Sequence, residues 1–155
     1  MNSDCKYLLL LRHAEAKQFV SGERDCDRFL TPYGCRSASE LGRASIMKVP
    51  IPQLIITSTA IRALQTAKLW AKAAEVSVSH LVICEKIYQA TCDSLLNLVS
   101  SLDEKIKTVL IVGHNPAISE LVSYISNQSI SVQTCTIAII SIRKRWINTM
   151  ASSSV

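Results

Sequence analysis

Two of the three histidines in this 155-residue chain directly follow apolar runs and stand beside residues that suit phosphate chemistry. Arg12 and His13 follow the run Tyr7–Leu11, and His114 follows the run Thr108–Val112 and one glycine. A neutral imidazole can attack phosphorus, and a second imidazole can donate a hydrogen bond to the charge that builds up. Arginine stays charged, and its planar fork of donors matches phosphate oxygens. The residue types therefore indicate a site for a phosphoryl group.

A third apolar run, Leu54–Thr57, precedes Ser58 and a helix-forming segment whose first turn carries Arg62. Taken alone, an arginine after a strand is usually a solvated surface residue, and a histidine before a helix is more often a cap or a packing residue. The shared position at the ends of apolar runs is what favours a site. Helix starts at Ala60 and Pro116 would add free backbone N–H groups there.

The elements that must position these residues are short apolar runs alternating with helix-length segments. The predicted strands are Tyr7–Leu11, Leu54–Thr57, His80–Cys84 and Thr108–Val112, and the predicted helices are Thr31–Lys48, Ala60–Ala74, Thr91–Leu102 and Pro116–Ile125. Thr31, Thr91 and Asn115 are the expected caps. Such alternation predicts an α/β fold, a three-layer α/β/α sandwich with a mostly parallel central sheet. Ligand sites in such sheets lie at the carboxyl ends of the strands.

Two further segments, Thr134–Ile142 and Trp146–Met150, show β-branched alternation and predict a C-terminal hairpin at the sheet edge. With 48% hydrophobic residues and only four glycines and four prolines, residues 1–155 predict one domain with a substantial core. The net charge of +5 suits an anionic substrate but also arises by chance. The basic residues are scattered, which argues against a nucleic-acid partner.

Six cysteines without C-x-x-C spacing predict free thiols and no metal site. The short, polar N-terminal stretch and a first apolar run too short for a membrane span lead us to expect no signal peptide. We therefore expect a cytoplasmic protein with no membrane partner.

Four motifs resemble those of the histidine phosphatase superfamily, in that family's order. Arg12-His13-Ala14 resembles the Arg-His-Gly signature, with alanine in the glycine position. The other three are Arg28-Phe29-Leu30-Thr31-Pro32-Tyr33-Gly34, Ser58-Thr59-Ala60-Ile61-Arg62-Ala63-Leu64-Gln65-Thr66-Ala67 and Gly113-His114-Asn115-Pro116. Within the superfamily, the chain is similar to the SixA-type branch, whose named activity is phosphohistidine phosphatase. This likeness rests on the small size, the sequence of residues 12–16 and the segment Ile87-Tyr88-Gln89-Ala90.

The resemblance implies a role for each matched residue. His13 would be the nucleophile that becomes transiently phosphorylated, without a metal or other cofactor. Arg12 and Arg62 would bind the phosphoryl oxygens, and His114 would stabilise the charge of the transition state. Arg28 would be a third arginine of the phosphate pocket, although a surface role before a helix cap remains open for it.

The chain departs from the family pattern where many members carry a carboxylic acid that protonates the leaving group. Gln89 occupies that position here, and Glu85 and Glu15 are the possible substitutes. General-acid help matters most for a poor leaving group. Because phosphohistidine releases an imidazole, a better leaving group than an alkoxide, the missing acid favours a phosphohistidine substrate over a sugar phosphate.

The short connections leave no material for a lid domain, which suits a phosphorylated protein such as a histidine phosphotransfer domain. The polar segment Lys17–Asp27 either contacts the substrate or is a solvated loop. Two alternatives stay open. One is a phosphatase for a small phosphate ester or anhydride, and the other is a phosphate-binding adaptor without turnover.

Overall fold

The structure is a computed structural model that describes residues 5–143, 145 and 146. Its sheet has five strands, β1 (Lys6–Arg12), β2 (Leu54–Thr57), β3 (Leu81–Ile83), β4 (Thr108–Gly113) and β5 (Ile137–Ile142). The strand order is β3-β2-β4-β1-β5, with β1 to β4 parallel and β5 antiparallel to β1. The four helices are α1 (Pro32–Ser45), α2 (Ile61–Ala73), α3 (Cys92–Ser100) and α4 (Ala117–Ser126). The predicted α/β fold with a mostly parallel sheet is confirmed.

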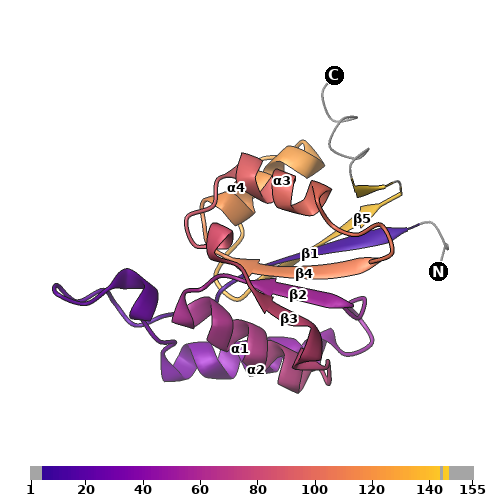
Figure 1. Ribbon diagram of the computed structural model, residues 1–155. Coiled ribbons are helices and arrows are strands. Elements are labelled where there is room, and N and C mark those ends of the chain that lie inside the picture. Colours follow the sequence, from indigo (N-terminus) through magenta and orange to yellow (C-terminus); the bar gives the residue numbers. More distant parts are fainter. Residues whose placement is uncertain (1–4, 144, 147–155) are drawn as a thin grey trace.

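Helices cover both faces of the sheet, α1 and α2 on one side and α3 and α4 on the other (Figure 1). Strand β1 shows why its apolar run is continuous. Leu8 and Leu10 pack in the cluster with α3 and α4, whereas Leu9 and Leu11 pack in the cluster with α2. Successive side chains of a strand point to opposite faces, so a strand buried on both faces needs apolar residues throughout.

Two of the three expected caps form as predicted. The Thr31 side chain accepts a hydrogen bond from the Gly34 N–H at the start of α1, and Thr91 forms a capping box with Ser94. The cap predicted at Asn115 is wrong by one residue, because α4 begins at Ala117 with Pro116 in the cap position. Asn115 Oδ1 accepts instead from the backbone and the hydroxyl of Ser119.

The predicted C-terminal hairpin is described only in its first strand. Strand β5 lies at the sheet edge and begins at Ile137, three residues later than predicted, because Cys135 adopts a left-handed φ of 54°. The Cys135 N–H donates to the carbonyls of Arg12 and His13, at 3.1 and 3.2 Å. In the second predicted strand, Trp146 is buried and 147–150 lie outside the described residues.

Candidate active site

His13 and His114 lie side by side because the strands that precede them are neighbours in the sheet. Arg12, the last residue of β1, pairs with Gly113, the last residue of β4, and the His13 N–H donates to the Gly113 carbonyl at 3.1 Å. His13 directly follows β1 and His114 directly follows β4, so both histidines lie at the same end of the sheet. Their ring centroids are 5.1 Å apart.

The imidazole of His13 is held with one nitrogen free to act as a base or nucleophile. Its Nδ1 lies 2.7 Å from the carbonyl oxygen of Ala14. A carbonyl only accepts hydrogen bonds, so Nδ1 carries the proton and Nε2 keeps its lone pair. Burial, with a further effect of the charges of Arg62 and Arg12, lowers the pKa of His13 to about 4 despite the bond to Ala14. The ring is therefore neutral at physiological pH.

Arg62 projects from the first turn of α2 and hydrogen-bonds the unprotonated nitrogen of His13. Its Nε donates to His13 Nε2 over 3.3 Å, and the residue is only 5% exposed. The two terminal nitrogens bind Asp25, one at the backbone carbonyl at 2.7 Å and one at carboxylate Oδ2 at 2.9 Å. The guanidinium is thus fixed with its Nε edge toward His13 Nε2.

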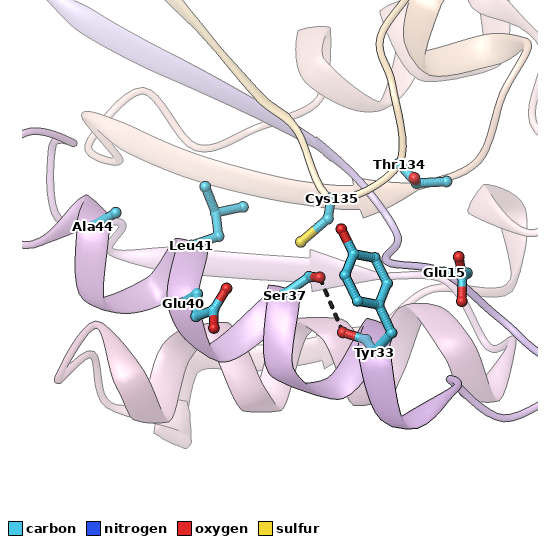
Figure 2. Close-up of a pocket in the computed structure, with 8 residues that line it drawn as sticks. All are labelled: Glu15, Tyr33, Ser37, Glu40, Leu41, Ala44, Thr134 and Cys135. Atoms are coloured by element: carbon cyan, nitrogen blue, oxygen red, sulfur yellow. Dashed lines mark hydrogen bonds between the residues drawn. The ribbon is translucent and has the colours of Figure 1, made fainter.

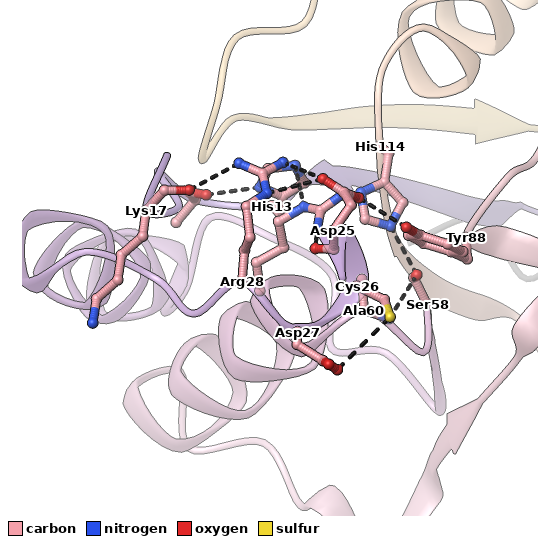
Figure 3. A network of polar contacts seen from close by, with 12 residues as sticks. His13, Lys17, Asp25, Cys26, Asp27, Arg28, Ser58, Ala60, Tyr88 and His114 are labelled. Atoms are coloured by element: carbon pink, nitrogen blue, oxygen red, sulfur yellow. Dashed lines mark hydrogen bonds and ion pairs between the residues drawn. The ribbon is translucent and has the colours of Figure 1, made fainter. Parts of the chain in front are cut away.

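Asp25, in the polar segment Lys17–Asp27, is a site residue that the sequence analysis missed (Figure 3). Its Oδ1 accepts a hydrogen bond from Arg28 Nε at 2.9 Å and lies 2.8 Å from Nη2 of the same guanidinium. Its Oδ2 accepts from Arg62 and, at 2.8 Å, from the hydroxyl of Tyr88. Burial acts to raise the pKa of Asp25, but hydrogen bonds from Tyr88, Arg62 and Arg28 lower it to about 2. The carboxylate therefore stays ionised.

Arg28 and Arg12 complete the set of arginines that the motifs singled out. The remaining guanidinium nitrogen of Arg28 donates to the Lys17 carbonyl at 2.9 Å, so Arg28 joins the site through Asp25. A direct contact of Arg28 with phosphate stays a prediction. Arg12 Nη1 donates a hydrogen bond to the Val132 carbonyl at 3.1 Å. The buried Nε of Arg12 has no hydrogen-bond partner among the described residues. Arg12 thus keeps a free donor beside His13.

His114 contacts Ser58 with one ring nitrogen and leaves the other free. Its Nε2 lies 2.7 Å from Ser58 Oγ, and its Nδ1 is buried without a partner among the described residues. The Tyr88 ring meets the imidazole edge-on, with centroids 5.8 Å apart. Burial, followed by the charges of His13 and Arg62, lowers the pKa of His114 to about 3. Both imidazoles are therefore neutral donors or acceptors, and neither is a cation.

Comparison with known proteins agrees with this arrangement. Residues 8–82 match the profile of the histidine phosphatase superfamily (branch 1). An uncharacterized protein of Mycobacterium leprae is 30% identical over 149 residues, which cover 88% of this chain and 89% of that protein.

Two solved structures extend the likeness over most of the chain. One is assigned as the phosphohistidine phosphatase SixA of Nakamurella multipartitia, with 27% identity, a TM-score of 0.77 and coverage of 94% of this chain and 89% of that one. The other, from Agrobacterium tumefaciens with the same assignment, has 28% identity, a TM-score of 0.77 and coverage of 86% and 90%. The chain belongs to the histidine phosphatase superfamily. Within it, the likeness is to SixA-type members.

In this histidine phosphatase, the residues considered as general acids make no hydrogen bond to the imidazoles within the described part of the chain. Gln89, Glu85 and Glu15 are all exposed. Glu15 Oε1 accepts a hydrogen bond from the Thr31 hydroxyl at 2.7 Å. Within residues 5–143, 145 and 146, none of the three has a hydrogen bond or ion pair with either imidazole or with Arg62. The carboxylate that does reach the site is Asp25, and its low pKa makes it a poor proton donor.

A separate cavity of about 360 Å³ lies beside α1, and its lining includes Glu40, Tyr33 and Cys135 but neither imidazole (Figure 2). Burial, with a smaller effect of Glu40, raises the pKa of Cys135 to about 11, so the cavity offers no thiolate at physiological pH.

The part of the chain that the structure describes holds no group of three metal-ligating side chains. None of its helices is long and apolar enough to cross a membrane.

Proposed function

We propose that this histidine phosphatase works without a metal, takes the phosphoryl group of its substrate onto His13 Nε2 and dephosphorylates protein phosphohistidine. The observation that carries the proposal is the bond from His13 Nδ1 to the Ala14 carbonyl, which leaves a lone pair on Nε2 beside Arg62. That nitrogen is the one atom of the site that combines nucleophilic character with a charged donor within 3.3 Å.

In the first step the Nε2 lone pair forms a bond to phosphorus as the bond from phosphorus to the leaving nitrogen or oxygen breaks. Arg62, Arg12 and His114 donate to the oxygens on which negative charge gathers. In the second step water attacks the phosphorus on His13, releases inorganic phosphate and restores the free imidazole.

We choose phosphohistidine as the substrate because the described residues of the site include no carboxylic acid suited to protonate a leaving group. Its one carboxylate, Asp25, is held ionised by Arg28, Arg62 and Tyr88. A substrate whose leaving group needs no strong acid suits such a site, and an imidazole is a better leaving group than an alkoxide. The similarity to structures assigned as SixA, at 27% and 28% identity, also favours this substrate class.

The loop that supplies Asp25 also exposes large apolar side chains, which favours a protein as substrate. Phe19 is 58% exposed and its neighbour Val20 is 55% exposed. Contiguous exposed apolar side chains mark surfaces that bind proteins. We therefore include a histidine phosphotransfer domain as the partner and, from six free cysteines, a reducing cytoplasmic location.

Phosphate release tests the proposal. The substrates are a phosphotransfer domain phosphorylated on histidine and p-nitrophenyl phosphate, each with and without EDTA and with His13→Ala as control. We expect EDTA-insensitive release from the protein substrate that His13→Ala abolishes. Release from the aryl phosphate alone would move the substrate to small esters, and release from neither would favour a phosphate-binding adaptor.

A further inference from the structure

The free nitrogen of His114 raises a question that the proposed mechanism leaves open. A neutral imidazole carries one proton, on Nδ1 or on Nε2, and only a protonated nitrogen can donate to a phosphoryl oxygen. The 2.7 Å distance from Nε2 to Ser58 Oγ fits either choice, because a hydroxyl both donates and accepts. The proton position therefore depends on the other hydrogen bonds of Ser58.

The hydroxyl of Ser58 is buried and already accepts one hydrogen bond. Its side chain is 0% exposed, and the Ala60 N–H donates to Oγ at 3.1 Å at the start of α2. The hydroxyl hydrogen still needs an acceptor, because an unsatisfied buried donor costs about 1–3 kcal/mol. Among the described residues, the acceptor within hydrogen-bond distance is His114 Nε2.

The hydrogen bonds of both residues are satisfied best when Ser58 donates to Nε2. The proton of His114 then resides on Nδ1, the buried nitrogen without a partner among the described residues. Either tautomer leaves Nδ1 unpaired there, but only this one also gives the Ser58 hydroxyl an acceptor. Figure 3 shows this second ring nitrogen on the side of the imidazole that faces His13 and Asp25. With the opposite tautomer, a lone pair on Nδ1 would face the negative oxygens of a phosphoryl group and repel them.

We infer that Ser58 is a positioning residue that fixes His114 as the Nδ1–H tautomer, so that its proton points at a phosphoryl group on His13. The role in turnover rests on the proposed function. The tautomer itself is a property of the free protein and can be measured without any substrate.

The direct test is ¹⁵N NMR of the histidine side chains, with the three histidines assigned by single substitutions. Long-range ¹H–¹⁵N correlations separate a protonated ring nitrogen from a bare one. We expect His114 of the unaltered protein to be protonated on Nδ1 at pH 7, and Ser58→Ala to raise the share of the Nε2–H form. Protonation on Nε2 in the unaltered protein, or an unchanged tautomer in Ser58→Ala, would overturn the inference.

Kinetics supply the second readout, on whichever phosphorylated substrate is turned over. Ser58→Ala is expected to lower kcat about tenfold to a hundredfold with little change in KM, because the lost donor acts on transition-state charge. The matched control is Ser45→Ala, which deletes another buried hydroxyl, one that hydrogen-bonds Leu41 and Trp70 and no histidine among the described residues. That variant is expected to lose stability but to keep kcat and the His114 tautomer.

The control also separates positioning from a general structural effect. An equal fall of kcat in Ser45→Ala would overturn the inference. If Ser58→Ala fails to fold, Ser58→Cys retains the volume and a weak donor, and an intermediate share of the Nε2–H form is expected; an unchanged tautomer in this variant counts against the role. Absence of turnover in the unaltered protein would remove the proposed function, while the NMR result would still decide the tautomer.

Discussion

Asp25 and Arg62 form an ion pair of 2.9 Å although 37 residues separate them in the sequence. The Asp25 carbonyl accepts a second hydrogen bond from the same guanidinium, so loop and helix are joined by two adjacent contacts. The other edge of the guanidinium, at Nε, faces His13. The polar loop therefore determines how the site presents its best-buried arginine.

Replacing Asp25 by asparagine is expected to lower kcat/KM about tenfold to a hundredfold. A hydrogen bond between charged groups contributes about 1.5–3 kcal/mol, and the loss would leave Arg62 less firmly oriented. Steady-state kinetics measure the effect. Asp27→Asn is the matched control, because Asp27 lies in the same loop but pairs with the exposed Arg24. Tighter inhibition by orthophosphate in Asp25→Asn would contradict positioning and indicate that the carboxylate competes with the substrate.

Arg62→Ala is expected to lower kcat/KM at least about a hundredfold, because a preorganised donor at the reacting group is lost. Arg62→Lys should recover little, since one ammonium cannot bind Asp25 twice and still face His13. Arg36→Ala, which removes an exposed arginine from α1, serves as the control for charge alone. A near-normal rate in Arg62→Ala would exclude the proposed phosphate contact.

The histidines predict that the site stays active well below neutral pH. Folding lowers the pKa of His13 from 6.5 to about 4, so the proposed nucleophile remains neutral at pH 5 and becomes protonated only near pH 4. An NMR titration of the His13 ring protons measures this directly, and a midpoint near 6.5 would refute it. The unfolded chain binds more protons between pH 6.5 and 4, so the free energy of unfolding should fall as the pH drops through that window.

The exposed apolar side chains of the loop predict an effect on protein substrates alone. Replacing Phe19 and Val20 together by serine should raise KM for a phosphorylated phosphotransfer domain several-fold and leave the kinetics with an aryl phosphate unchanged. Ile51→Ser provides the control, because this 77% exposed residue precedes the amino end of β2, opposite the carboxyl ends of the strands where the site lies. Equal effects on both substrates would argue against a docking role for the loop.

The close approach of Gly34 to the backbone that follows His13 predicts a loss of stability when a side chain is added there. A Cβ at this position would collide with the backbone carbonyl of Glu15, two residues after the nucleophile. Gly34→Ala should therefore lower the free energy of unfolding by about 1–3 kcal/mol and reduce activity by displacing the Ala14–Glu15 backbone. Urea unfolding measures the first effect. Ser37→Ala, one turn further along α1, is the control, and equal stabilities of the two variants would contradict the collision.

Local sequence patterns were enough to predict the order of the elements and the residues at their ends. Continuous apolar runs mark strands buried on both faces, and parallel strands bring their carboxyl ends to one edge. Those two rules place Arg12, His13 and His114 at the same end of the sheet, and they act over a few residues at a time, so local pattern was enough for this much. The pairing of β1 with β4, which brings the two rings to 5.1 Å, is a contact between segments distant in sequence.

Only the tertiary structure decided which polar side chains complete the site. The polar loop contains three acidic residues that the sequence alone does not distinguish: Glu23, Asp25 and Asp27. The path of the loop brings Asp25 into contact with Arg62 and Tyr88. The same holds for Ser58, whose contact with His114 crosses from the end of one strand to the end of another. A loop path has no periodicity, because its backbone is set by contacts distant in sequence, so no local pattern could have singled out these residues.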